Sequence, residues 1–145
     1  MRFFFYGTLL AGRDNPFAAA AHAVLRPLGP ATVRGRLYAL PDPQGWYPAL
    51  LPGEGTTQGA LYESTEHFGE ADLARIDAYE DYHPENPAAS LYVREILPAS
   101  MADGASHKAQ AYFFNQPLPP GSMPIAGGDF AAWLAISGFR ALGEG

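Results

Sequence analysis

Residues 1–10 of the chain are MRFFFYGTLL, an apolar run that stops at a glycine. The run from Phe3 to Tyr6 predicts a short buried strand, and Gly7-Thr8-Leu9 is the tight loop that follows it. Glycine can take a positive φ, and without a Cβ it lets a ligand approach the backbone. Successive backbone N–H groups in such a turn can bind an anion or an oxyanion. Taken alone, this short pattern favours an ordinary turn after a terminal strand.

The remaining chain is predicted to alternate strands and helices without an internal repeat. Helices are predicted over 17–25 and 70–82, and a last helix starts after Asp129 and ends at Gly138 or Gly143. A loop over 41–52 leaves room for a short strand at 49–51, and Gly35 suggests a bend within its strand. The main strands are predicted at 31–40, 58–63, 91–97 and 107–114. This order indicates an α+β fold, a small mixed and strongly curved sheet or barrel with two to three flanking helices.

Composition limits the function classes that remain. A chain of 145 residues favours a single domain over 1–145, and 16 glycines with 14 prolines predict many turns. A net charge of −6 leaves no basic face for nucleic acid. The absence of cysteine excludes disulfides, thiolate metal sites and a cysteine nucleophile. Because the N-terminal apolar run is too short for a signal sequence or a membrane span, we expect a soluble cytoplasmic protein.

The helix over 70–82 carries two carboxylates on its apolar face. Leu73 and Ile76 define that face, and the next positions on it are Asp77 and Glu80. A carboxylate at Glu80 would point toward the core or a cleft, in the last turn where the helix dipole disfavours negative charge. Both effects raise its pKa and make it a better proton acceptor near neutrality. The alternative is a frayed helix end with a solvated Glu80, and Asp77 is expected only to hold the next loop by hydrogen bonds.

No other pattern in the sequence predicts a catalytic, metal or cofactor site. The four histidines lack metal-ligand spacing, and no serine or threonine lies in a nucleophile-elbow motif. The segment Trp46-Tyr47-Pro48 could line a pocket, although aromatic core packing is the commoner role. Tyr92 and Tyr112 lie in predicted strands, where each either packs or donates one hydrogen bond inside a cavity.

The chain resembles the γ-glutamylcyclotransferase-like proteins, with motifs in the family's order from residue 2 to about residue 134. Tyr6-Gly7-Thr8-Leu9 followed by Asp77-Ala78-Tyr79-Glu80-x-Tyr82 is the most specific part of the resemblance. The other matching motifs are Gly12…Asn15, Arg34-Gly35-x-Leu37-Tyr38, Tyr47-Pro48-Ala49, Gly59-x-Leu61-Tyr62, Tyr92-x-Arg94 and Gly128-Asp129-Phe130.

The resemblance implies a small α+β barrel in which the YGTL loop and Glu80 share one cavity. It implies that Glu80 acts as general base and then general acid, while the substrate's α-amino group attacks its own γ-carbonyl. The products would be 5-oxoproline and a free amine or amino acid. The implied substrate-binding residues are Tyr6, Gly7, Thr8, Leu9 and Tyr92. The reaction implies a small γ-glutamyl substrate and needs no cofactor, metal, nucleic acid or membrane.

Two departures from the family pattern concern the surroundings of Glu80. Many relatives have glycine directly after the catalytic glutamate, where this chain has Asp81, and the loop over 83–90 is longer than the minimum. Two other functions stay open: a binding module that keeps the cavity for a small carboxylate metabolite, and a scaffold that uses its proline-rich segments. Either a monomer or a homodimer is compatible with the sequence.

Overall fold

The computed structural model describes residues 1–7, 16–139 and 141, with only the backbone of Pro16 and Phe17. The N-terminal half holds two short elements, two very long strands and a helix: β1 (Arg2–Phe5), α1 (Pro16–His22), β2 (Leu25–Asp42), β3 (Gly45–Ser64) and α2 (Glu70–Tyr79). The other half holds a 3₁₀ turn, three strands and a helix: η1 (Pro87–Ala89), β4 (Tyr92–Met101), β5 (Ser106–Phe114), β6 (Met123–Pro124) and α3 (Phe130–Ser137).

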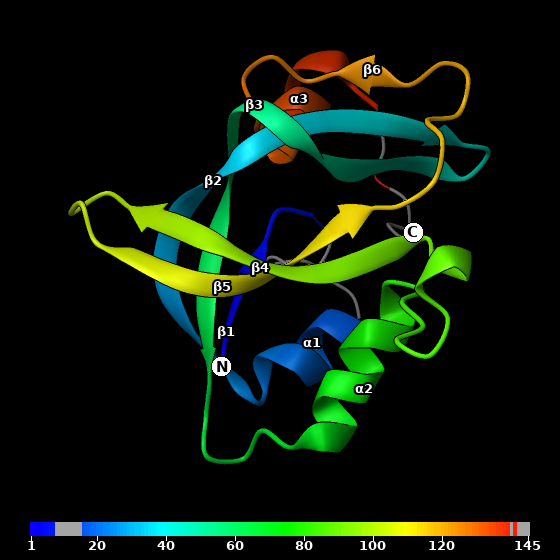
Figure 1. The fold of residues 1–145 in the computed structure, drawn as a ribbon. Coiled ribbons are helices and arrows are strands. Elements are labelled where there is room, and N and C mark those ends of the chain that lie inside the picture. Colours follow the sequence, from blue (N-terminus) through cyan, green and yellow to red (C-terminus); the bar gives the residue numbers. More distant parts are fainter. Residues whose placement is uncertain (8–15, 140, 142–145) are drawn as a thin grey trace.

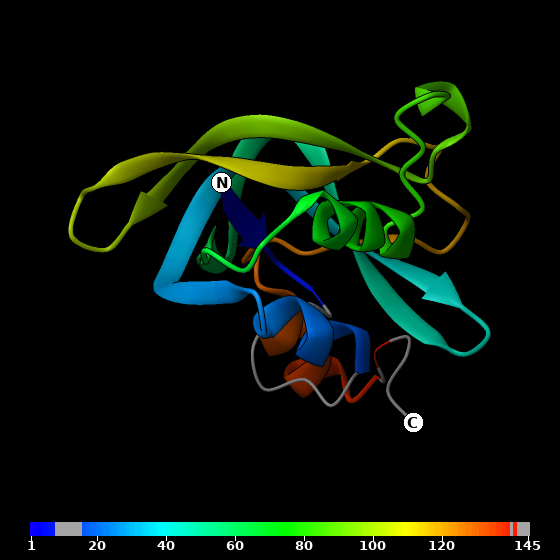
Figure 2. The same ribbon diagram turned by 90° about the horizontal axis from the view of Figure 1, so that it is seen from below.

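Five strands form a closed mixed barrel, which confirms the predicted α+β class (Figure 1). Around the barrel the order is β3-β1-β5-β4-β2, and β2 pairs with β3 to close it, while β6 pairs with β2 outside the ring. The β1–β5 pairing is parallel, and the other pairings between the named strands are antiparallel, including that of β4 with β5. Figure 2, seen from below, shows α1 and α2 on one side of the barrel.

The β2–β3 hairpin corrects the prediction of a loop over 41–52. Its register runs from Leu25 opposite Ser64 to Asp42 opposite Gly45, and Pro48 lies within β3 opposite Ala39. Proline is tolerated there because this part of β3 pairs only with β2, so its other edge needs no N–H donor.

The predicted bend at Gly35 is confirmed by a register shift between Arg34 and Arg36. A Cβ at Gly35 would come within 2.6 Å of a Leu50 methyl carbon, so the backbone there packs too closely for a side chain. The residues of β3 between Leu51 and Thr56 bulge out of the register at the same place.

The phenylalanines of β1 divide between two apolar clusters. Phe4 packs inside the barrel with Val33, Leu61 and Phe113, whereas Phe3 and Phe5 point outward. The outward face would be exposed in a bare barrel, but α1 and α2 cover it with residues such as Ala18 and Ile76. Since both faces of β1 are covered, three consecutive residues of the strand are apolar instead of every second one.

The ends of α3 and the C-terminal end of α2 show how the local sequence starts and stops a helix. Asp129 accepts a hydrogen bond from the Ala132 N–H (3.0 Å), and Gly138 ends α3 at φ 74°, as predicted. By contrast, α2 ends at Tyr79 rather than Tyr82, because Asp81 takes a left-handed φ of 54°. No helix among the described residues is both long and apolar enough to span a lipid bilayer.

Candidate functional site

Glu80 is the C-cap residue of α2, and its side chain is partly buried rather than solvated at a frayed end. Its backbone N–H still donates to the Ile76 carbonyl (3.1 Å), so the helical geometry reaches it. The carboxylate has no hydrogen bond or ion pair within the described part of the chain. Burial, and after it the negative charge of Asp77, raises the pKa of Glu80 from 4.5 to about 8. The group is therefore partly protonated at neutral pH and can both accept and release a proton.

Asp77 lies one turn earlier on the same helix and has three hydrogen-bond donors. It is 6% exposed. Arg94 Nε lies 2.9 Å from one carboxylate oxygen and an Arg94 terminal nitrogen lies 3.3 Å from the other, while the Tyr112 hydroxyl donates at 2.5 Å. These contacts tie α2 to β4 and β5. The prediction that Asp77 holds the next loop therefore named the right kind of interaction but the wrong partners.

Three tyrosines lie close enough to Glu80 for its charge to act on them. Burial raises the pKa of Tyr6 well above its usual value, and the charge of Glu80 raises it further. Glu80 acts in the same direction on the pKa of Tyr92 and of Tyr112, in each case after burial. Since charge effects of this kind need proximity, the end of β1 and the end of α2 meet in one region.

The hydroxyl protons of these tyrosines are already used by backbone carbonyls or by Asp77. Tyr6 donates to the Tyr112 carbonyl (2.5 Å) and accepts from the Leu50 N–H (3.3 Å), and Tyr92 donates to the Pro48 carbonyl (2.6 Å). Near Glu80 these groups therefore offer acceptor lone pairs rather than donors. Such a lining suits a ligand that brings its own protons, such as an ammonium group.

Gly7 lies at the start of the predicted anion-binding loop. A Cβ there would come within 2.6 Å of Pro48 Cγ, whereas its φ lies outside the left-handed region. Close packing against Pro48, not a positive φ, is thus the reason for glycine. Thr8 and Leu9 lie outside the described residues, so backbone binding by Gly7 to Leu9 stays a prediction.

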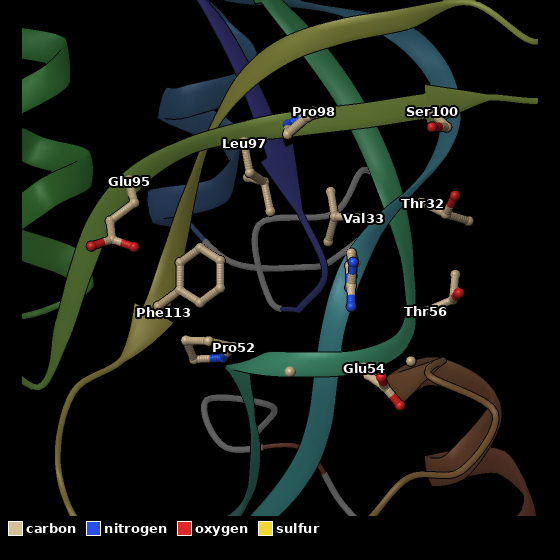
Figure 3. Close-up of a pocket in the computed structure, with 13 residues that line it drawn as sticks. Thr32, Val33, Pro52, Glu54, Thr56, Glu95, Leu97, Pro98, Ser100 and Phe113 are labelled. Atoms are coloured by element: carbon tan, nitrogen blue, oxygen red, sulfur yellow. The ribbon is translucent and has the colours of Figure 1, made fainter.

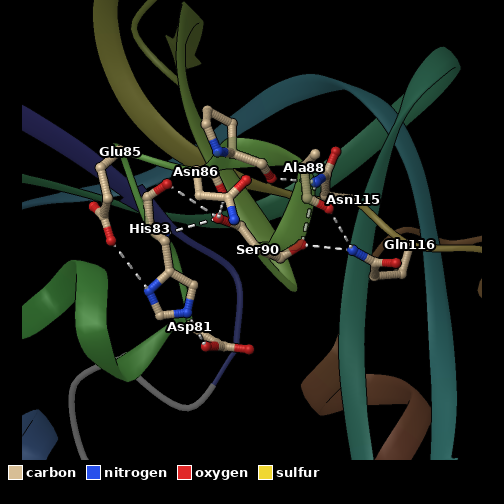
Figure 4. A network of polar contacts seen from close by, with 9 residues as sticks. Asp81, His83, Glu85, Asn86, Ala88, Ser90, Asn115 and Gln116 are labelled. Atoms are coloured by element: carbon tan, nitrogen blue, oxygen red, sulfur yellow. Dashed lines mark hydrogen bonds and ion pairs between the residues drawn. The ribbon is translucent and has the colours of Figure 1, made fainter.

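The loop after Glu80 is closed by hydrogen bonds around the fully buried Ser90 (Figure 4). The Ser90 hydroxyl accepts from the His83 N–H (2.7 Å), and the Ser90 carbonyl accepts from the Asn115 (3.1 Å) and Gln116 (2.8 Å) side chains. His83 also contacts the Asp81 carboxylate at 2.7 Å. The loop is therefore fixed to the end of β5, and Asp81 points to this loop rather than competing with Glu80 for one space.

Arg94 belongs to this region but was not identified as a site residue from the sequence. Arg94 binds Asp77 and also donates to the Gln110 side chain at 2.8 Å. The available signal was the alternation of β4, which puts Tyr92 and Arg94 on one face. Trp46 packs against Trp133 and Phe139, with ring centroids 5.2 and 4.9 Å away, so it fills apolar space as the commoner alternative expected. The described residues hold no group of three potential metal ligands.

Comparison with known proteins gives one family and a common fold. Residues 3–132 match the sequence model of the family described as gamma-glutamyl cyclotransferase, AIG2-like. No curated protein matches the chain. The protein ytfP of Escherichia coli is 26% identical, with a TM-score of 0.57, over 90% of this chain and 96% of its own.

Two further solved structures show the same fold at lower identity. An AIG2-like protein of Mus musculus is 24% identical over 81% of this chain and 79% of its own, with a TM-score of 0.60. An uncharacterized protein of Pyrococcus horikoshii is 17% identical over 95% and 96% of the two chains, also with a TM-score of 0.60.

Proposed function

Because the chain belongs to the gamma-glutamyl cyclotransferase, AIG2-like family, we propose that it is a γ-glutamyl cyclotransferase with Glu80 as general base and acid. The substrate would be a γ-glutamyl amine or γ-glutamyl amino acid, and the products 5-oxoproline and the free amine. The observation that supports this proposal is a partly buried carboxylate with a pKa of about 8 that has no partner among the described residues. A general base works best when its pKa lies near the working pH.

The proposed reaction is an intramolecular aminolysis. Glu80 takes a proton from the α-ammonium group of the substrate, and the freed amine attacks the γ-carbonyl carbon. A new C–N bond closes the five-membered ring while the bond to the leaving nitrogen breaks. The ring nitrogen loses its second proton to solvent, and Glu80 returns its own proton to the leaving nitrogen. Atoms and charges balance without a metal, a nucleotide or a covalent intermediate on the protein.

The surroundings of Glu80 support the first and last steps. The acceptor lone pairs of Tyr6 and Tyr92 suit the substrate's ammonium group, and a folded substrate brings amine and carbonyl into near-attack geometry, which lowers the barrier by several kcal/mol. We assign the backbone N–H groups of Gly7 to Leu9 to the substrate's carboxylate or to the developing oxyanion. We place the enzyme in the cytoplasm, because a chain without cysteine fits a reducing compartment. We propose that it acts as a monomer or a homodimer.

A panel of γ-glutamyl amines and γ-glutamyl amino acids, with 5-oxoproline as the measured product, tests the proposal. Glu80→Gln should lower the rate about 10²- to 10⁴-fold, the usual contribution of a general acid/base. Glu66→Gln makes the same charge change at an exposed position and should leave the rate unchanged.

Circular dichroism should show that both variants keep the fold. Unchanged turnover in Glu80→Gln would refute the role of Glu80. Thermal stabilisation of the wild-type protein by these compounds without any product would instead support a binding module.

A further inference from the structure

Pro48 of β3 is the point where the β2–β3 hairpin meets the elements around Glu80. The Tyr92 hydroxyl of β4 donates to the Pro48 carbonyl (2.6 Å), and Gly7, at the end of β1, lies against the Pro48 ring. Because this part of β3 pairs only with β2, no strand separates Pro48 from β1 and β4. The hairpin residues next to Pro48 therefore border the region that holds Glu80.

Tyr47, the next residue toward the end of the hairpin, faces the outer apolar cluster that contains Tyr92. Side chains alternate along a strand. Tyr47 therefore shares its face with Ala49, which belongs to that cluster, and with Leu51, which packs against it. Trp46 packs against the interior cluster on the other face. Since Tyr47 is only partly buried, its ring forms the rim of the outer cluster toward solvent.

The hydroxyl of Tyr47 lies near the same groups as the Glu80 carboxylate. Burial raises the pKa of Tyr92 well above its usual value, and the charges of Tyr6, Glu80 and Tyr47 raise this pKa further. Unlike Tyr6 and Tyr92, Tyr47 donates its proton to no described residue. The rim thus offers a hydrogen-bond donor beside two hydroxyls that offer lone pairs.

Asp42, at the end of β2, brings a negative charge to this rim. Burial raises the pKa of Tyr47, and the charge of Asp42 raises it further. The Asp42 carboxylate is exposed, accepts a hydrogen bond from the Gln44 N–H (3.0 Å) and forms no ion pair with a described residue. A ligand carboxylate at the Tyr47 hydroxyl would be repelled by this charge, whereas a neutral carbonyl would not.

The opening in the barrel wall between β2 and β4 is a separate place. Figure 3 shows charged and hydroxyl side chains around it, among them Glu54, Thr56 and Glu95. Neither Tyr47 nor Glu80 lines this opening. The surface next to Glu80 is therefore the Tyr47 side of the hairpin.

We propose, on the basis of the cyclotransferase function proposed above, that Tyr47 and Asp42 select the leaving group of the substrate. The glutamyl part binds at Glu80, so the leaving group extends toward the partly exposed rim. There the Tyr47 hydroxyl donates a hydrogen bond to a neutral acceptor, and Asp42 disfavours a carboxylate. The preferred substrates are γ-glutamyl derivatives of amines with a neutral carbonyl, such as amino acid amides, rather than of free amino acids.

Three γ-glutamyl compounds with leaving groups of similar shape test this selection. L-Alaninamide carries a neutral carbonyl, L-alanine carries a carboxylate, and 1,2-dimethylpropylamine carries neither. With 5-oxoproline as the measured product, kcat/KM should be highest for the alaninamide compound. It should be about fivefold lower for the dimethylpropylamine compound, which is the effect of one ordinary hydrogen bond. The alanine compound should be no better than the dimethylpropylamine compound, because Asp42 opposes its charge.

Two variants assign the selection to the two residues. Tyr47→Phe should lower kcat/KM about fivefold for the alaninamide compound and leave it unchanged for the dimethylpropylamine compound, a difference that a general structural defect would not produce. Asp42→Asn should raise kcat/KM about threefold for the alanine compound only, as expected for an exposed charge. Tyr38→Phe removes a hydroxyl without a described hydrogen bond from the neighbouring strand and should change none of the three values.

Failure of this inference can be told apart from failure of the proposed function. If no compound yields 5-oxoproline, the cyclotransferase function is wrong, and calorimetric affinities of the three compounds for the wild-type protein test the rim instead. Equal kcat/KM for the alaninamide and dimethylpropylamine compounds, or equal or absent affinities without turnover, would overturn the role of Tyr47. An alanine compound that is the best of the three would overturn the role of Asp42.

Discussion

Asp77 and Glu80 lie one turn apart on the same face of α2, yet the structure treats the two carboxylates in opposite ways. Asp77 is buried and accepts hydrogen bonds from Arg94 and Tyr112, which fix the helix against the barrel. Glu80 is partly buried beside three tyrosines and has no such partner among the described residues. One carboxylate is fixed by its hydrogen-bond donors, while the other has a raised pKa and a proton that it can exchange.

The difference teaches that burial alone does not define a functional acid. Both side chains leave water, but donors compensate the charge of Asp77, and nothing in the described part compensates the charge of Glu80. Asp77 also contributes to the raised pKa of Glu80, because its negative charge lies on the same helix face. The structural carboxylate thus helps to set the proton affinity of the reactive one.

Asp77→Asn should have the largest effect on stability. The substitution keeps the shape but removes the charge that Arg94 binds, and breaking a buried pair from one side costs about 3 kcal/mol. Urea denaturation measures the free energy of unfolding, with the exposed Glu66→Gln as the control for loss of one negative charge. A loss below about 1 kcal/mol, the range of surface ion pairs, would contradict the structural role of Asp77.

Glu80→Gln should change stability in the opposite direction, and only at higher pH. The unfolded chain releases the Glu80 proton near pH 4.5, whereas the folded protein holds it to about pH 8. Between these values the folded state binds the additional proton, so the free energy of unfolding of the wild type falls as the pH rises and levels off above about pH 8.

The Glu80→Gln variant has no titrating group at this position, so its free energy of unfolding does not show this fall with rising pH. The two pKa values correspond to about 4 kcal/mol between about pH 5 and about pH 9. Because solvent reaches this partly buried carboxylate and weakens the effect, the variant should gain on the order of 2 kcal/mol relative to the wild type. Urea denaturation at both pH values measures the gain. A difference between the two proteins that does not vary with pH would show that Glu80 has an ordinary pKa.

Tyr112→Phe should have a smaller effect, because Asp77 keeps Arg94 as a partner. Loss of one hydrogen bond to a charged group corresponds to about 1.5 kcal/mol of unfolding free energy. Tyr38→Phe is the matched control, since the Tyr38 hydroxyl has no hydrogen bond in the described part of the chain. Equal stabilities of the two variants would mean that the short contact between Tyr112 and Asp77 contributes nothing.

Asp81→Gly should have the smallest effect, a gain of about 0.5 kcal/mol, because glycine adopts the left-handed conformation without strain. Asp81→Ala separates this cause from the loss of the contact with His83, since alanine also removes the carboxylate but keeps the Cβ. Thermal unfolding should rank glycine above aspartate and alanine below it. Equal unfolding temperatures of the Asp81→Ala and Asp81→Gly variants would exclude backbone strain at this position.

Much of the fold could be predicted because local signals agreed with the tertiary structure. The cap at Asp129 and the stop at Gly138 identified α3, and the β-type residues of 91–97 and 107–114 identified β4 and β5. The apolar face of α2 put Asp77 and Glu80 together before any coordinates. These features depend on neighbours within a few residues of sequence, which is the range that periodicity reports.

Other features depended on contacts far away in sequence. The prolines at 41, 48 and 52 predict a loop, and only the unpaired edge of β3 explains why that strand tolerates Pro48 and Pro52. The end of α2 was misplaced because the left-handed position is occupied by Asp81 instead of glycine. Arg94 lies in the predicted strand 91–97, but the sequence could not identify Asp77 as its partner, since no local rule links residues on separate elements.

The short strand β1 has a consequence for how the chain folds. Its residues pair with 60–63 of β3 and with Gln110 of β5, so both partners of β1 lie far away in sequence and are synthesised long after it. Until then, three phenylalanines that are almost fully buried in the native barrel stay exposed. Such distant pairings slow folding and prolong the exposure of an aggregation-prone segment. One edge of β1 therefore stays unpaired until β5 has formed.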